Sequence, residues 1–294
     1  MDLEKYRKAV AESYDSMAEY IDRIRIKDFR RETTFECIVT ASVTKCYDFT
    51  RHVATLKKGT ATFYYLGTLR GLCEELIAIT YLQSLPKAEL NEILEFRIPF
   101  EMQETIIKQA EFFDVYNPHQ LIIHPDWMMA DDRIEFIRNR PIKKGRAKRK
   151  GYKELPSIWK MAQQVGFSDL YNYLYFATSS LVHFRIETLL KMGWNSGAIE
   201  GETMKNGIFS PYNYENYYWY FNVFYGNWIF SEMIRNYNKT LGFSNKIKQK
   251  ISQLEKLKKK ITWPELTTFE HMNIRVEPMH YIMHAMRMIK KEES

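Results

Sequence analysis

A histidine near the end of a mostly apolar run is the first residue whose surroundings suggest chemistry. In the stretch DLYNYLYFATSSLVHFR, residues 169–185, His183 lies four positions after Ser179 and four before Glu187. On a helix these three side chains share one face, so Ser179 can hydrogen-bond the imidazole and Glu187 can hold it in one tautomer. Such a histidine serves either as a general acid or base or as part of a buried structural network, and the residues leave both open.

A charged pair on another apolar stretch has the same helical spacing. In LGTLRGLCEELIAITYL, residues 66–82, Arg70 and Glu74 are four positions apart. Burying a charged pair without further partners is costly, whereas two such helices packed together can satisfy each other's polar groups. We therefore expect Arg70, Glu74, Ser179 and His183 to converge in space.

A concentrated basic segment is the strongest charge feature of the chain. The protein has a formal net charge of +7, and nine of the sixteen residues from Arg138 to Lys153 are Lys or Arg. Such a run is either a solvated loop or a loop that contacts phosphates, and nucleic acid is the polyanion that would use it. The residues predicted to contact a nucleic-acid backbone are Lys143, Lys144, Arg146, Lys148, Arg149 and Lys150.

Helical periodicity dominates the elements that must position these residues. Apolar residues recur at steps of three and four, the alternation of strands is scarce, and the chain has only 12 glycines and 9 prolines. Helices are predicted at residues 3–29, 33–56, 60–83, 87–114, 154–165, 168–192, 213–239, 244–261 and 277–291.

These elements predict an all-α fold, a multi-helix bundle of long helices. Residues 1–294 form either a single helical domain or two closely packed helical lobes, with residues 115–153 as an irregular basic connecting segment. The aromatic run at residues 212–228 has helical spacing, which is typical of a helix in the core rather than of a platform for stacking bases.

Composition and sequence pattern also indicate the cellular compartment. The charged N-terminus does not have the pattern of a signal peptide, and no apolar run reaches the roughly 18 residues that span a bilayer. Cys37, Cys46 and Cys73 have neither C-x-x-C spacing nor close histidine partners, which is typical of free thiols in a reducing compartment. We therefore expect a cytoplasmic protein that has no membrane contact.

A metal site is an alternative in the last predicted helix. Glu277, His280 and His284 in EPMHYIMH have E-x-x-H and H-x-x-x-H spacing and would share a helix face. A di-iron bundle needs a second E-x-x-H on another helix, and none occurs, so any site would be mononuclear and would need ligands from another segment. The other interpretation is a partly exposed terminal helix, and we expect no cofactor.

Three motifs together resemble a known family. They are R-x-x-x-E at Arg70, W-x-x-A-x-x-x-G in SIWKMAQQVG at residues 157–166, and Y-x-x-x-S-x-x-x-H at Tyr175, Ser179 and His183. The pattern, which covers about residues 61–83 and 153–186, resembles an uncharacterised family of bacterial all-helical proteins found among prokaryotic defence genes. That family is in turn similar to the HEPN superfamily of helical bundles, many of which are metal-independent ribonucleases, toxins or abortive-infection effectors.

The resemblance implies a defence or toxin-type protein that acts on RNA without a metal. HEPN nucleases carry R-x(4-6)-H on one helix, but His183 has no arginine at those distances upstream. A network across two helices would replace that motif: His183 as general base or acid at the ribose 2′-hydroxyl, Arg70 stabilising transition-state charge, and Glu74 and Ser179 positioning them.

The alternative is a non-catalytic sensor, antitoxin-like or scaffold subunit in which the same polar network is structural. Such a subunit would bind nucleic acid, RNA more readily than DNA, or a partner protein. The sequence leaves open whether the chain forms a homodimer or pairs with a protein encoded in the same operon.

Overall fold

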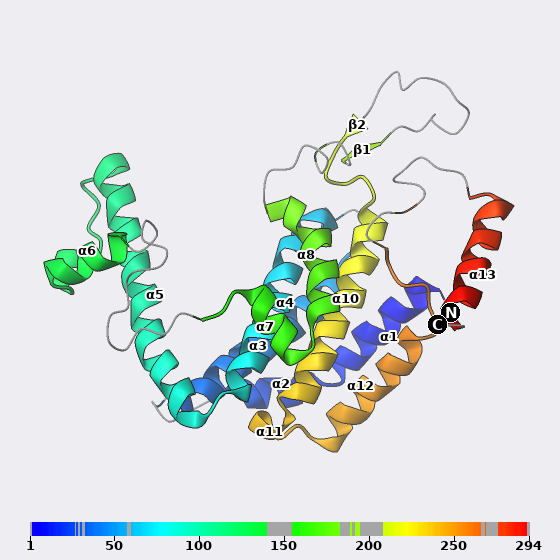
Figure 1. Cartoon of the computed structure of the whole chain (residues 1–294), viewed down its shortest axis with the longest axis horizontal. Helices are drawn as coiled ribbons and strands as arrows, with labels where there is room; N and C mark the ends of the chain where they lie inside the picture. Colours follow the sequence, from blue (N-terminus) through cyan, green and yellow to red (C-terminus); the bar gives the residue numbers. More distant parts are fainter. Residues whose placement is uncertain are drawn as a thin grey trace.

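The protein is a bundle of helices from which one long helix extends (Figure 1). The computed structural model describes residues 2–26, 28, 30, 33–57, 60–139, 155–182, 189, 192–194, 208–265, 268 and 276–292. The prediction of an all-α multi-helix fold is confirmed. The only sheet in these ranges is a pair of two-residue antiparallel strands, with Gly193 opposite Phe209 and Trp194 opposite Ile208.

The helices α3, α4 and α5 follow the predicted ranges closely. In chain order they are α1 (Leu3–Asp15), α2 (Ala18–Arg25), α3 (Thr34–Thr55), the 3₁₀ turn η2 (Thr62–Tyr65), α4 (Leu66–Ser84), α5 (Lys87–Tyr116), the 3₁₀ turn η3 (Pro125–Trp127) and α6 (Asp131–Asn139). The second half contains α7 (Ile158–Val165), α8 (Ser168–Val182), strands β1 (Gly193–Trp194) and β2 (Ile208–Phe209), α10 (Glu215–Asn236), α11 (Asn238–Leu241), α12 (Asn245–Lys258) and α13 (Pro278–Glu292).

The helix predicted over residues 3–29 is broken between α1 and α2, so this prediction was wrong in detail. The hydroxyl of Tyr47 on α3 donates a hydrogen bond to the backbone carbonyl of Tyr14 at 2.7 Å. The same carbonyl accepts the amide of Met17 at 3.0 Å in a tightened last turn. A tertiary hydrogen bond thus helps to end the helix, and the local residue pattern does not predict this end.

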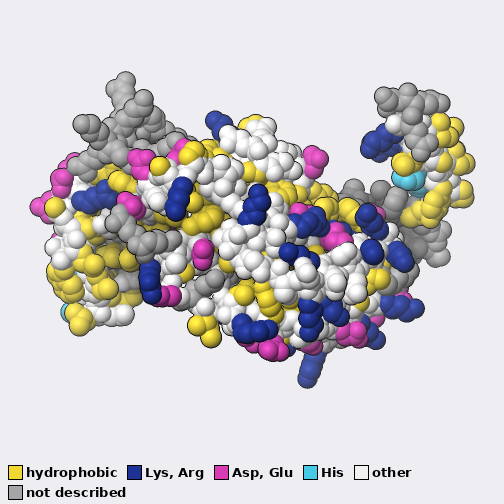
Figure 2. Space-filling view, turned by 90° about the horizontal axis from the view of Figure 1, so that it is seen from below, with side chains coloured by type: hydrophobic (Ala, Val, Ile, Leu, Met, Phe, Trp, Pro, Cys, Tyr) yellow, Lys and Arg dark blue, Asp and Glu magenta, His cyan; other side chains and the backbone are white. Residues whose placement is uncertain are grey.

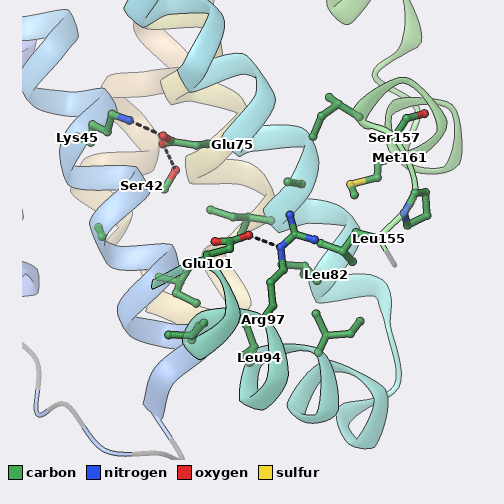
Figure 3. Close-up of a pocket in the computed structure, with 18 residues that line it drawn as sticks. Ser42, Lys45, Glu75, Leu82, Leu94, Arg97, Glu101, Leu155, Ser157 and Met161 are labelled. Atoms are coloured by element: carbon green, nitrogen blue, oxygen red, sulfur yellow. Dashed lines mark hydrogen bonds and ion pairs between the residues drawn. The ribbon is translucent and has the colours of Figure 1, made fainter. Parts of the chain in front are cut away.

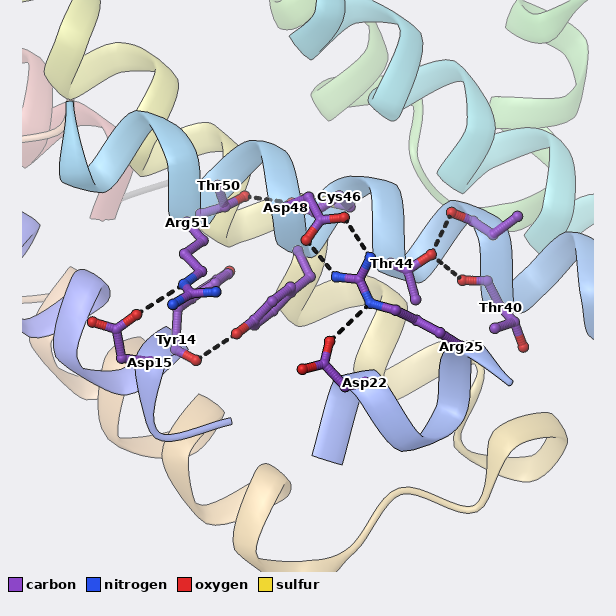
Figure 4. A network of polar contacts seen from close by, with 12 residues as sticks. Tyr14, Asp15, Asp22, Arg25, Thr40, Thr44, Cys46, Asp48, Thr50 and Arg51 are labelled. Atoms are coloured by element: carbon purple, nitrogen blue, oxygen red, sulfur yellow. Dashed lines mark hydrogen bonds and ion pairs between the residues drawn. The ribbon is translucent and has the colours of Figure 1, made fainter. Parts of the chain in front are cut away.

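Charged side chains on one side of α3 hold the two N-terminal helices (Figure 4). Arg25 on α2 contacts Asp48 of α3 and pairs with Asp22 at 3.1 Å, and Arg51 of α3 pairs with Asp15 of α1 at 2.8 Å. These side chains are exposed, so each pair contributes little stability and serves mainly to orient α1 and α2.

Helix α10 lies at the centre of the main hydrophobic core. Its buried residues include Trp219, Phe221, Phe224 and Tyr225, which confirms the prediction that the aromatic run is core. Helices α1, α3 and α4 pack around it, and α7, α8 and α12 contribute to the same cluster. The apolar surface removed from water here is the main source of stability.

A smaller hydrophobic cluster lies on the part of α5 that extends away from the bundle (Figure 1). Its buried members are Phe100, Ile107, Met129, Ile134 and Ile137. Two of them belong to α6, a helix within residues 115–153, which were predicted to be irregular. The prediction missed α6 because its nine residues are mostly charged and only a few apolar positions face α5.

Helix α13 stands apart from the bundle, and its large apolar side chains are exposed to solvent (Figures 1 and 2). Met279, Tyr281 and Met283 are 59%, 69% and 61% exposed. Within the described ranges, no helix combines the length and apolar character needed to cross a membrane.

The close approach of α3 and α10 yields a stability prediction. A Cβ added at Gly226 would lie 2.8 Å from Oγ1 of Thr50 and 3.2 Å from the ring of Phe49. We expect Gly226→Ala to lower the free energy of unfolding by about 1–3 kcal/mol because the added methyl overpacks the core. Urea denaturation measures the change.

Gly71 in α4 is the matched control, because a Cβ there would meet no atom within 4 Å. Gly71→Ala should raise the unfolding free energy by about 0.5–1 kcal/mol through helix propensity. Equal effects of the two substitutions would contradict the proposed close crossing.

Candidate functional site

Four side chains from α4 and α8 form a compact polar and aromatic group, here called the α4–α8 cluster: Arg70, Glu74, Tyr171 and Tyr175. Nε of Arg70 donates to Oε1 of Glu74 at 2.9 Å, one turn along α4. The Arg70 guanidinium carbon lies 4.7 Å from the centroid of the Tyr175 ring, and the rings of Tyr171 and Tyr175 are 5.3 Å apart. Two of the predicted site residues, Arg70 and Glu74, are therefore together and are covered by α8.

Arg70 is mostly buried, and one of its guanidinium nitrogens has no acceptor among the described residues. Its side chain is 16% exposed, and its Nη1 is buried with no hydrogen-bond partner among the described residues. A buried guanidinium nitrogen without an acceptor costs free energy, so such a group calls for an explanation. An anionic oxygen reaching Nη1 would supply the missing acceptor.

Arg7 is an equally buried arginine with a full set of partners and provides the comparison. It is 15% exposed and donates from Nε and Nη2 to the two carboxylate oxygens of Glu4 at 2.9 and 2.7 Å. Its Nη1 donates to the backbone carbonyl of Ala54, and its guanidinium lies 4.7 Å from the centroid of the Trp219 ring. Each nitrogen of the Arg7 guanidinium thus has an acceptor, as expected of a structural arginine, whereas Nη1 of Arg70 has none in the described part of the chain.

Tyr171 and Tyr175 were not among the predicted site residues. Burial raises the pKa of Tyr171, and the nearby Tyr175 hydroxyl and Glu74 carboxylate raise it further, so its phenol stays protonated. The signal that could have found them is their spacing, because Tyr171, Tyr175 and Ser179 follow one another at single-turn intervals.

Ser179 is also on α8 and is buried, with 2% exposure. His183, the next residue at this spacing, lies outside the described residues, as do the six basic residues Lys143, Lys144, Arg146, Lys148, Arg149 and Lys150. Arg70 and Glu74 pair on α4, and whether Ser179 and His183 converge with them stays a prediction.

One protein family covers this region of the chain. A model of a family of unknown function, DUF5677, matches residues 37–199 of the 294. The chain belongs to this family. The matched range runs from α3 through β1, so it includes both helices of the α4–α8 cluster.

No curated protein and no solved structure matches the chain. The expectation of an uncharacterised family is confirmed, and its function must be argued from the site.

The alternative metal ligands lie on α13 and just before it. His284 and Glu277 are exposed, and Nδ1 of His280 accepts the backbone amide of Glu277 at 2.8 Å, which caps the start of the helix. Among the described residues, no group of three His, Cys, Asp or Glu side chains is placed to hold a metal ion. The metal alternative thus has no complete ligand set in this part of the chain.

A cleft of about 740 Å³ lies where α5 leaves the bundle, between α3, α4 and the start of α7 (Figure 3). Its charged residues are already paired with each other: Lys45 contacts Glu75, and Arg97 contacts Glu101. Ser42 also donates to Glu75 at 3.2 Å. A cleft whose charges neutralise one another has less to offer an anionic substrate than the incompletely bonded Arg70.

The contrast between the two arginines yields a test of whether Arg70 is structural. We expect Arg70→Met to leave the melting temperature unchanged or raised, because an apolar chain of similar volume removes the unpartnered nitrogen. Glu74, left alone, is 32% exposed and can be hydrated.

Arg7→Met is the control and should lower the unfolding free energy by about 1–3 kcal/mol, since it breaks several satisfied hydrogen bonds. Thermal denaturation of both variants measures the two changes in stability. A loss for Arg70→Met as large as that for Arg7→Met would assign Arg70 to the structural framework.

Proposed function

We propose that the protein acts on RNA as a metal-independent endoribonuclease and that the α4–α8 cluster forms part of its active site. The observation that supports this most is the buried Nη1 of Arg70, which has no acceptor among the described residues although it lies beside Glu74 and Tyr175. A phosphate oxygen is the anionic acceptor that RNA would bring to it, and arginine suits phosphate because of its planar set of donors.

The proposed chemistry is transesterification by the ribose 2′-hydroxyl. His183, one turn beyond Ser179 if α8 continues, takes the proton from the 2′-hydroxyl as its oxygen attacks phosphorus. The bond from phosphorus to the 5′-oxygen breaks, and that oxygen takes up a proton, leaving a 2′,3′-cyclic phosphate and a 5′-hydroxyl. Arg70 would stabilise the extra negative charge of the transition state, with Glu74 holding its guanidinium in place.

The sequence resemblance supports the biological setting of this proposal. The motifs at Arg70, Tyr175 and His183 resemble those of helical proteins found among prokaryotic defence genes, and these are similar to HEPN ribonucleases and toxins. We therefore propose a cytoplasmic defence or toxin-type protein, with RNA held in part by the basic residues from Lys143 to Lys150.

A second function is favoured by the burial of Ser179, which is only 2% exposed. A sealed network would orient α4 against α8 without touching a substrate. The protein would then be a non-catalytic subunit that binds nucleic acid or a partner protein.

Cleavage of RNA by the purified protein in EDTA is the direct test of the first function. We expect His183→Ala to lower the cleavage rate at least about a hundredfold, because removing a general acid or base typically costs this much. The melting temperature should stay close to that of the native protein.

His119→Ala, at an exposed histidine beyond α5, is the matched control and should cleave RNA normally. Activity that is lost in EDTA and restored by a divalent ion would contradict the metal-independent mechanism. An inactive native protein together with a destabilised His183→Ala would favour the binding function.

The basic segment gives a separate prediction about RNA affinity. Replacing Lys143, Lys144, Arg146, Lys148, Arg149 and Lys150 with Ser should weaken RNA binding and flatten its dependence on salt, because fewer counterions are released. Filter binding at several salt concentrations measures the slope. The comparison variant replaces lysines 246, 248 and 250 of α12 with Ser and should retain the native slope; an unchanged slope in the first variant would remove the segment from the interface.

A further inference from the structure

An aromatic pocket of about 540 Å³ lies on the other side of α8, away from the α4–α8 cluster. Three segments that are distant in sequence meet there: the first turns of α8, the middle of α10, and the residues that follow α12 (Figure 1). The residues that line it are Asp169, Leu170, Tyr173, Tyr225, Trp228, Trp263, Pro264 and Glu265. The volume is in the range of small-molecule sites.

Four aromatic rings form the walls of this aromatic pocket. The ring centroids of Tyr173 and Tyr225 are 5.5 Å apart, and those of Trp228 and Trp263 are 5.0 Å apart at an interplanar angle of 70°. Tyr225 and Trp228 join the two pairs at 6.0 Å. Trp263 is 43% exposed, so the group opens to solvent instead of being sealed in the core.

Hydrogen bonds hold these rings in place before any ligand arrives. The hydroxyls of Tyr173 and Tyr225 both donate to the backbone carbonyl of Pro264, at 3.0 and 2.8 Å. Nε1 of Trp263 donates to the backbone carbonyl of Lys258 at 3.2 Å. The phenol protons and the Pro264 carbonyl are thus engaged, which leaves ring surfaces and carboxylates to contact a ligand.

The charged residues that line the aromatic pocket are opposite in sign to the net charge of the protein. Its two charged lining residues, Asp169 and Glu265, are acidic, although the chain has a net charge of +7. Both carboxylates are exposed at its mouth, and neither has an ion-pair partner among the described residues. Burial is the main cause that raises the pKa of Tyr173, and the Glu265 carboxylate raises that pKa further.

A lysine ammonium group already lies over one ring of this group. Nζ of Lys258 lies 4.4 Å from the centroid of the Trp228 ring, and its own carboxylate partner is Glu255 at 2.7 Å. The Lys258 side chain is 5% exposed, so this ammonium group is held away from water by a ring and a carboxylate. A tryptophan ring and a carboxylate together thus already bind one ammonium group next to the pocket.

We propose that the aromatic pocket binds a small organic cation that carries a methylated, quaternary ammonium group. Ring faces attract such a cation through their quadrupoles. A quaternary ammonium group has no N–H donors, so it suits walls that offer few hydrogen-bond acceptors. Asp169 and Glu265 add attraction at the mouth and disfavour anions. A neutral ligand of the same shape would gain only the burial of its apolar surface.

This site is independent of the proposed ribonuclease function. Tyr225, Trp228 and residues 263–265 lie outside the range matched by the family, whereas the α8 residues of the pocket lie within it.

Tryptophan fluorescence of the full chain tests the proposal, because Trp228 and Trp263 report on the pocket directly. Choline is the quaternary probe, ethanolamine is its primary-amine counterpart, and 3,3-dimethyl-1-butanol is its neutral isostere. We expect choline to change the emission saturably, ethanolamine to bind more weakly and the neutral alcohol to give no saturable change. No saturable change in millimolar choline, or equal binding of choline and the neutral alcohol, would overturn the proposal.

Variants locate the binding. Trp263→Leu keeps an apolar side chain but removes the ring, and it should weaken choline binding at least about tenfold. Glu265→Gln should weaken it about threefold at low salt, with a smaller effect at high salt. Trp127→Leu and Glu19→Gln, at positions that are 67% and 89% exposed elsewhere, are the controls and should bind choline as the native protein does.

Melting curves show whether Trp263→Leu is folded. If it is not folded, the choline affinity of Glu265→Gln alone tests the proposal, because this exposed substitution leaves the aromatic walls intact. Native affinity in a folded Trp263→Leu or in Glu265→Gln at low salt would place the cation elsewhere and refute the proposed site.

Discussion

Helix α10 is buried on nearly all sides and still carries polar side chains, and this constraint organises the bundle. A buried polar group must find a partner inside the protein. Asn227 accepts from the hydroxyl of Tyr14 at 3.1 Å and donates to that of Tyr6 at 2.9 Å, which fixes α1 against α10. Asn222 donates to the carbonyl of Thr62 at 3.1 Å and so holds η2, which leads directly into α4. The position of Arg70 on α4 therefore depends on the polar groups of a different helix.

Helix α8 connects the two sites that we propose. Residues two positions apart on a helix point about 200° apart, so Tyr171 and Tyr173 lie on nearly opposite sides of α8. Tyr171 joins Tyr175 beside Arg70, whereas Tyr173 joins Tyr225 in the aromatic pocket. On α10 both groups of the Asn227 amide are bonded, whereas Oδ1 of Asn222 on α10 and Nη1 of Arg70 beside α8 have no partner among the described residues. Departures of this kind from local satisfaction are expected where a protein binds something.

The sequence predicted the fold class and the core helices well because helical periodicity is a local signal. Residues 33–56 and 87–114 were predicted as helices, and α3 and α5 span Thr34–Thr55 and Lys87–Tyr116. The spacing of Arg70 and Glu74 was enough to predict their pairing, since residues four apart on a helix meet without help from the fold. The short charged α6 and the break between α1 and α2 were missed, because partners elsewhere in the chain decide both.

By itself, the sequence thus determined most of the helical segments, their apolar faces and the pairing of Arg70 with Glu74 within one turn. Only the tertiary structure decided that Arg70 lies under Tyr175 with one nitrogen that has no acceptor among the described residues, whereas the equally buried Arg7 has all its partners. It also decided that Tyr173, Tyr225 and Trp263 meet around one pocket. The contacts of Arg70 with Tyr175, of Arg7 with Ala54 and of Tyr173 with Tyr225 join residues about 50 to 105 positions apart. Short-range periodicity carries no information about such contacts, because helix packing sets them through shape and burial.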